Sequence, residues 1–153
     1  MYKILQHFIK ILTISTLLSL GFSAHADAEH SKEFGDYTIH YNAFRSDMLS
    51  PEIAKQYNLT RRNNRVIVNI SVIKKVANTT GTAAPAKVTG HLKNLTGQMK
   101  TIEFNEIKED TAIYYLAESQ FTDGEFLKFN IQVMPEGETK TASIKFDKRL
   151  STH

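Results

Sequence analysis

The chain has 153 residues, of which 41% are hydrophobic and 23% charged, and it contains no cysteine. This length and balance predict one folded domain and exclude an intrinsically disordered protein. The missing cysteines exclude disulfide scaffolds, thiol catalysis and cysteine-based metal sites.

The first 26 residues have the pattern of a secretory signal peptide. Lys3 and Lys10 give a positive start, residues 11–22 are apolar, and Ala24-His25-Ala26 matches a signal-peptidase site. The apolar run is too short for the roughly 20 residues of a membrane-spanning helix. We therefore expect cleavage after Ala26 and a periplasmic protein without an integral membrane span after processing, with an uncleaved anchor as the alternative.

Removal of the signal peptide changes the charge balance. Without Lys3 and Lys10, the 19 basic residues become 17, against 16 acidic ones. The basic cluster that stands out is Arg61, Arg62 and Arg65. Nucleic-acid binding needs a concentrated positive surface, so we expect no nucleic-acid partner.

The mature chain begins with a polar stretch, residues 27–34, which we expect to be a flexible leader. From Tyr37 the hydrophobic pattern has a period of two, which is typical of a strand. Ser50-Pro51-Glu52 then has the form of a helix start, with Ser50 as the N-cap. This short helix is expected to end near Asn58.

The rest of the chain alternates between short apolar-periodic runs and turn residues. The clearest strand covers residues 65–75, and a loop is predicted at 77–85. Gly90 predicts a bulge or a close backbone approach in the following strand. The remaining strands are expected at residues 87–93, 99–105, 112–121, 126–134 and in a last run through Ala142, Ile144 and Phe146.

About seven strands with closely spaced turns predict an all-β fold. We expect a single immunoglobulin-like antiparallel β-sandwich over residues 35–150, with one short helix after the first strand. A small closed barrel is the alternative, because strand number alone does not separate the two architectures.

The sequence contains no recognisable catalytic or metal-binding pattern. Its histidines beyond residue 26 are spread along the chain, and no H-E-x-x-H, H-x-H or Gly-x-Ser-x-Gly pattern occurs. The acidic residues Glu103, Glu106, Glu109 and Asp110 have the pattern of an exposed rim. We therefore predict no enzyme activity, no catalytic residues, no cofactor and no metal.

Polar and aromatic residues of the kinds that recognition surfaces favour recur near the predicted strands. They define an interaction surface of His40, Asn42, Arg45, Arg61, Arg62, Asn69 and Tyr114. The alternative, which we prefer, is that Asn69 and Arg62 satisfy buried backbone groups where the helix packs on the sandwich. Tyr114 and Tyr115 are expected on opposite faces of their strand.

Several segments resemble a family of small exported proteins of Gram-negative bacteria, known as domain of unknown function 4426. The resemblance rests on residues 35–44, 49–57, 68–72 and 112–118, with Asn58 where the family has Gly. Both residue types tolerate a left-handed conformation at a helix end. The resemblance implies a periplasmic, single-domain, immunoglobulin-like β protein with no established activity, and it supplies no catalytic residues.

Two functional hypotheses remain. The first is a non-enzymatic protein-interaction module that pairs a free sheet edge with an extended segment of another periplasmic or envelope protein. The second is a periplasmic carrier of a small ligand or metal, which uses His40, Tyr41 and Arg45 or a tyrosine-lined cleft. The sequence leaves the oligomeric state and the identity of the partner open.

Overall fold

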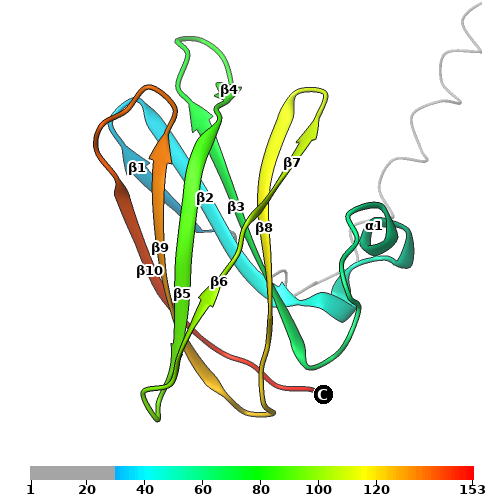
Figure 1. Cartoon of the computed structure of the whole chain (residues 1–153). Helices are drawn as coiled ribbons and strands as arrows, with labels where there is room; N and C mark the ends of the chain where they lie inside the picture. Colours follow the sequence, from blue (N-terminus) through cyan, green and yellow to red (C-terminus); the bar gives the residue numbers. More distant parts are fainter. Residues whose placement is uncertain (1–29) are drawn as a thin grey trace, which may run out of the picture.

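The computed structural model describes residues 30–153, which form two antiparallel sheets packed face to face (Figure 1). Sheet A has the order β1-β2-β3-β8-β7, and the short β4 also pairs with β3. Sheet B has the order β10-β9-β5-β6. The two sheets confirm the predicted sandwich.

The strands of sheet A are β1 (His30–Phe34), β2 (Tyr37–Arg45), β3 (Arg65–Lys74), β4 (Thr82–Ala83), β7 (Asn105–Glu109) and β8 (Ala112–Gln120). The strands of sheet B are β5 (Ala86–Asn94), β6 (Met99–Ile102), β9 (Phe126–Pro135) and β10 (Ala142–Arg149).

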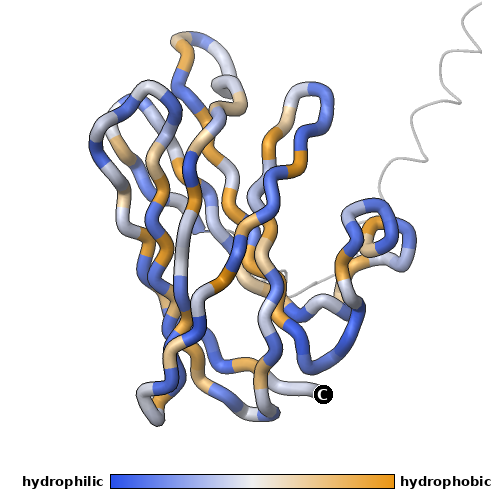
Figure 2. Tube along the Cα trace, viewed as in Figure 1, coloured by the Kyte–Doolittle hydropathy of each residue, from blue (hydrophilic) through white to orange (hydrophobic). Residues whose placement is uncertain are grey.

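The core lies between the sheets and follows the predicted period of two. Alternate residues of β3 and β9 point inward and are almost fully buried, because each strand presents one face to the other sheet. Figure 2 shows the resulting alternation of hydrophobic and hydrophilic residues along both sheets. Phe129 and Phe146 stack within this core, with ring centroids 4.7 Å apart.

Two local predictions about backbone conformation are confirmed. Gly90 lies close to β9, since a Cβ at this position would lie 3.2 Å from the backbone oxygen of Asn130. Asn58 adopts φ of 54°, the left-handed conformation that ends the helix. At these two positions the backbone conformation or the close approach of another strand, rather than side-chain packing, therefore determines which residues fit.

Three strands were not predicted. Residues 30–34 form β1 and pair with β2 in register, so the expectation of a flexible leader is wrong for them. β1 is polar and exposed, and backbone pairing alone gives it strand structure without a hydrophobic pattern. Similarly, β7 lies where an acidic rim was expected, and β4 lies in the expected loop. Residues 1–29, with the predicted signal peptide and the first part of the leader, lie outside the described residues.

The predicted strand over 99–105 also ends early. β6 stops at Ile102, and the chain then crosses from sheet B to sheet A to form β7. Ile102 is buried as expected, and Phe104 packs against the core from the crossing segment. The alternation of residues along a strand does not show that the chain has changed sheet.

Residues 46–64, between β2 and β3, form an excursion that leaves the sandwich (Figure 1). It contains the 3-10 helix η1 (Ser46–Met48) and the helix α1 (Pro51–Gln56). Ser50 is the N-cap of α1, as predicted, and its hydroxyl accepts a hydrogen bond from the amide of Ile53 at 3.3 Å. No helix among residues 30–153 has the length and apolar character needed to cross a bilayer.

Candidate functional site

The excursion and the outer face of sheet A line an open cavity of about 230 Å³. The outer face is the side of sheet A that faces away from sheet B. Its contribution comes from β2, β3, β8 and the end of β7, while the excursion supplies the opposite wall. The cavity is lined by Phe44, Ile67, Asn69, Glu109, Tyr114 and Leu116 of the sheet and by Leu49, Ile53, Tyr57 and Leu59 of the excursion.

The cavity exists because the outer face of sheet A is apolar where the excursion covers it. Ile67 is fully buried although it points away from the core between the sheets, and Leu116 is 8% exposed. A helix of six residues offers few side chains, so it covers this surface without filling the space. For comparison, an engineered apolar cavity of ~150 Å³ is large enough to bind benzene.

Asn69 brings an unpartnered polar atom to this lining. Its side-chain Oδ1 is buried and has no hydrogen-bond partner, a property shared by one other side-chain atom of the described residues, Nε of Arg65. An unsatisfied buried oxygen destabilises a fold by about 1–3 kcal/mol. Oδ1 of Asn69 therefore does not compensate a buried backbone group.

Glu109 supplies the one charged group that residues 30–153 bring to the cavity lining. Its Oε1 accepts hydrogen bonds from the Tyr57 hydroxyl and from Nε2 of Gln56, the latter at 3.3 Å. The bond to Glu109 is the main cause that raises the pKa of the Tyr57 hydroxyl, so this group remains a donor at neutral pH. Within the same part of the chain, no cation forms an ion pair with Glu109.

A second carboxylate holds the other end of the excursion. Glu118 Oε2 accepts a hydrogen bond from the Thr60 amide at 3.0 Å and lies 3.7 Å from Nη1 of Arg65. The buried hydroxyl of Ser46 also bonds to both the amide and the carbonyl of Arg62, each at 2.9 Å. The excursion is thus fixed to sheet A at several points, which hold it over the outer face.

The structure brings together part of the interaction surface named from the sequence. Asn69 and Tyr114 both line the cavity. His40 and Asn42 lie on the same outer face by register, with Asn42 opposite Asn69. Tyr115 points inward and is 4% exposed, which confirms that the two adjacent tyrosines point to opposite faces.

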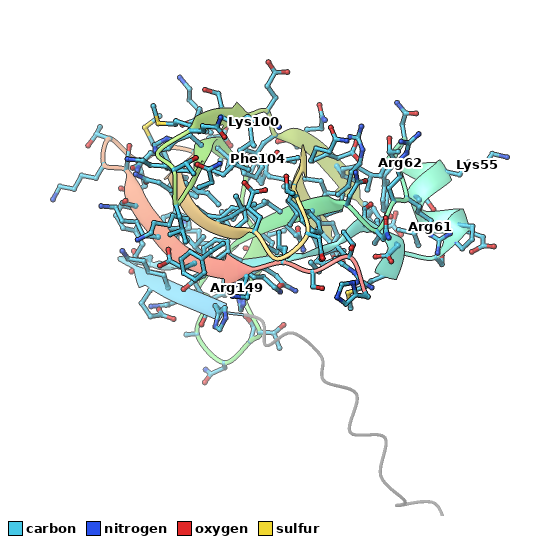
Figure 3. All side chains as sticks on the ribbon, turned by 90° about the horizontal axis from the view of Figure 1, so that it is seen from below. Lys55, Arg61, Arg62, Lys100, Phe104 and Arg149 are labelled. Carbon is cyan, nitrogen blue, oxygen red and sulfur yellow. The ribbon has the colours of Figure 1, made fainter. Side chains whose placement is uncertain are left out.

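The three arginines of that surface are placed differently. Arg45 bonds to Asp47 and to the carbonyls of Ser151 and His153 near the C-terminus. Arg61 donates to the carbonyls of Leu49 and Asp47, so it holds the excursion together. Figure 3 shows Arg61 and Arg62 at the excursion end of the molecule, with Lys55 nearby.

Tyr57, Ile53 and Glu109 are site residues that the sequence reasoning assigned to other roles. Ile53 and Tyr57 had the spacing of core residues, and Glu109 belonged to a predicted acidic rim. A signal was present on the second face of β3, where the apolar Ile67 and Ile73 accompany the polar Arg65, Asn69 and Ser71. An apolar outer face requires a cover, and the excursion is the segment that provides it.

A larger hollow of about 700 Å³ lies at the end of the sandwich near the β5–β6 and β8–β9 turns. The carboxylates that line this hollow already accept hydrogen bonds from other parts of the fold. Glu125 accepts from the Thr122 amide at 2.7 Å, and Asp123 accepts from the Thr152 amide at 2.8 Å. Because these groups are engaged within the fold, this hollow is a weaker candidate than the cavity.

The geometry also separates the residues considered for a metal or ligand carrier. His40 lies on the outer face of sheet A, while the ring of Tyr41 contacts Phe146 on the core side. Residues 30–153 contain no group of three or more His, Cys, Asp or Glu side chains that could hold a metal ion. Of the carrier alternatives, the tyrosine-lined cleft is the one with a matching cavity.

Comparison with known proteins gives a family and a fold. The family model described as "Domain of unknown function (DUF4426)" matches residues 31–152. A DUF4426 family protein, PA0388 from Pseudomonas aeruginosa PAO1, is 32% identical in sequence, with a TM-score of 0.71. The match covers 82% of this chain and 97% of that one. The comparison with curated proteins finds no match.

More distant structures share the fold. FetP of uropathogenic E. coli strain F11, expressed in the periplasm of E. coli, is 11% identical with a TM-score of 0.57, and the match covers 81% of this chain and 94% of that one. A copper-bound variant of FetP gives 11% identity and a TM-score of 0.56, over 80% of this chain and 95% of that one. Identity this low supports a common fold and nothing finer.

Proposed function

The chain belongs to the DUF4426 family of unknown function, and we propose that it is a non-enzymatic binding protein for a small molecule held in the cavity beneath α1. The observation that carries this proposal is the concave, mostly apolar lining, in which Oε2 of Glu109 accepts no hydrogen bond from residues 30–153. Small-molecule sites are typically concave and mostly apolar, with a few placed polar groups. A bound molecule with a hydrogen-bond donor can pair with this carboxylate oxygen.

The experiment compares a cavity-filling variant with a matched control. Ile53→Trp places an indole beside the cavity, whereas Met48→Trp puts the same side chain on an exposed part of the excursion outside the lining. Small molecules are screened by thermal shift and by amide chemical-shift mapping. A ligand at a hundredfold excess over its Kd would stabilise the wild type by about 2.7 kcal/mol.

We expect ligands to shift the melting temperature of the wild type and of Met48→Trp, and to leave Ile53→Trp unchanged. Chemical-shift changes should be concentrated at the cavity lining. If every ligand that stabilises the wild type stabilises Ile53→Trp equally, the cavity is not the binding site and the proposal is wrong. A screen in which no compound binds the wild type contradicts it as well.

The hypothesis of strand addition receives less support from the contacts. Two lysine side chains span the gap between β10 and sheet A: Lys32 Nζ donates to the Ser143 carbonyl at 2.8 Å, and Lys148 Nζ donates to the Ala43 carbonyl. Lysines at sheet edges discourage pairing with further strands. We therefore keep a protein partner as the second candidate, to be tested by amide exchange of the edge strands when envelope proteins are added.

We also propose that the protein acts in the periplasm after cleavage behind Ala26. The support is the signal-peptide pattern of residues 1–26. Denaturing mass spectrometry of the protein purified from its own host tests this step. A mass that begins at Asp27 is the expected result, and a full-length mass would contradict it.

A further inference from the structure

The chemistry of the lining limits which small molecule the cavity suits. This inference rests on the proposed binding function and concerns the class of ligand. Three aromatic side chains contribute to the walls: Phe44 and Tyr114 from the sheet and Tyr57 from the excursion. Of the described residues, no lysine, arginine or histidine lines the cavity, and the single charge they give it is the carboxylate of Glu109. The site is therefore negative in charge, aromatic in its walls and without a positive group of its own.

We infer that the cavity binds an organic ammonium ion with an apolar body, held by Glu109 and the aromatic walls. An ammonium group provides hydrogen-bond donors, and the polar atoms available to it are acceptors. Both hydrogen bonds that Glu109 receives fall on Oε1, which leaves Oε2 as an acceptor. Aromatic rings stabilise organic cations by about 0.5–2 kcal/mol per contact.

Other ligand classes fit the lining less well. An anion would meet Glu109 without any cation to compensate its charge. A bare metal ion needs several oxygen, nitrogen or sulfur ligands, and the cavity offers one carboxylate among mostly apolar side chains. A neutral molecule would leave the carboxylate of Glu109 without a partner of opposite charge. The apolar walls provided by Leu49, Ile67 and Leu116 match the hydrocarbon part of an alkyl or aryl ammonium.

The position of Glu109 supports a role in charge recognition. It lies at the end of β7 on the outer face, and the Tyr57 hydroxyl and the Gln56 amide orient its carboxylate from the excursion. In contrast, Glu118 at the other end of the excursion is compensated by Arg65. The two carboxylates both hold the excursion, but the described residues leave the charge of Glu109 unpaired.

The test uses two probes of similar shape, n-hexylammonium and n-hexanol, which differ in charge at the polar end. Binding of each is measured by calorimetry and chemical-shift mapping to wild type, Glu109→Gln, Glu138→Gln and Ile53→Trp. Glutamine retains an acceptor for Tyr57, so the fold should survive. Glu138→Gln removes one negative charge from the exposed β9–β10 turn and controls for net charge.

We expect n-hexylammonium to bind the wild type at least tenfold more tightly than n-hexanol. Glu109→Gln should abolish this preference and Glu138→Gln should retain it. If the two probes bind equally and Ile53→Trp blocks both, the ammonium inference is overturned while the cavity remains a binding site. If both probes bind Ile53→Trp as well as the wild type, or neither binds the wild type, the ammonium inference fails, and the thermal-shift screen then decides the binding function separately.

Discussion

The two faces of sheet A bury apolar residues under very different covers. The inner face packs against sheet B over the full length of its strands, and its β3 residues Val66, Val68, Ile70 and Val72 are fully buried. The outer face is also apolar at Ile67 and Leu116, but its cover is a short excursion with one six-residue helix. A full sheet fills the space above its partner, whereas a short helix leaves a cavity. Burial on the inner face therefore stabilises the fold, whereas burial on the outer face also leaves a space that a ligand can occupy.

The largest test of this comparison uses two isoleucines on the same strand. Ile70 and Ile67 are both fully buried, on the inner and outer faces of β3 respectively. Replacing a buried Ile by Ala costs about 2–5 kcal/mol, and the cost depends on how well the surroundings pack. We expect about 4 kcal/mol for Ile70→Ala and about 2 kcal/mol for Ile67→Ala, which borders an existing cavity, as measured by urea unfolding. Equal losses would show that the two faces are packed equally well.

Replacement of Asn69 is expected to change the free energy of unfolding by a smaller amount and in the opposite direction. Asn69→Leu removes the unpartnered oxygen, so the free energy of unfolding should rise by about 1 kcal/mol. The same variant should leave the binding of n-hexylammonium close to that of the wild type, because Oδ1 of Asn69 is buried below the cavity surface. Ser71→Val, on the same face but outside the lining, is the matched control and should leave binding unchanged. A loss of stability in Asn69→Leu would mean that the oxygen contributes to the fold.

The cover itself is tested through its N-cap. Ser50→Ala removes the acceptor for the Ile53 amide and should cost about 1 kcal/mol or less, since the helix is short. We expect faster amide exchange in α1 while exchange in β3 stays unchanged. The control Lys55→Gln replaces an exposed residue in the last turn of α1 and leaves the serine cap in place. Exchange rates in α1 that match the wild type would indicate that the tertiary contacts alone hold the helix.

The last prediction concerns Tyr115 on the inner face of sheet A and describes a loss of stability at alkaline pH, not at neutral pH. Burial raises the pKa of the Tyr115 hydroxyl to about 12, and this hydroxyl bonds to Glu106 and to the Ala86 amide. Because the folded-state pKa lies above the ordinary value, the stabilisation is complete below about pH 10. It is lost as the pH rises toward 12. Unfolding free energies measured across this range should fall for the wild type and fall less for Tyr115→Phe.

The sequence predicted the parts of the fold that depend on local patterns. The period of two in residues 65–75 indicated a strand, and Ser50-Pro51 indicated where the helix begins. β1 escaped prediction because its five residues carry no hydrophobic alternation and owe their strand structure to pairing with β2. The change of sheet after Ile102 was not predicted for a related reason, since the periodic pattern of a strand is the same in either sheet.

The candidate site was predictable only in part. The sequence indicated Asn69 because it is a polar residue within an apolar strand. It indicated Tyr114 because it is one of two adjacent tyrosines. Glu109 and Tyr57 did not, because 52 residues separate them in the chain and each fitted an ordinary local role. Their hydrogen bond depends on the excursion folding back over the outer face of sheet A.

The amino-acid sequence by itself determined that this chain is a single β-sandwich domain with a short capped helix, because strand alternation, turn residues and helix caps act over a few neighbouring positions. Only the tertiary structure decided that the helix covers the outer face of sheet A, that a cavity lies between them, and that Glu109 and Asn69 share its lining. These features depend on contacts between distant segments, and the packing of a short helix on a wide sheet sets how much space is left unfilled.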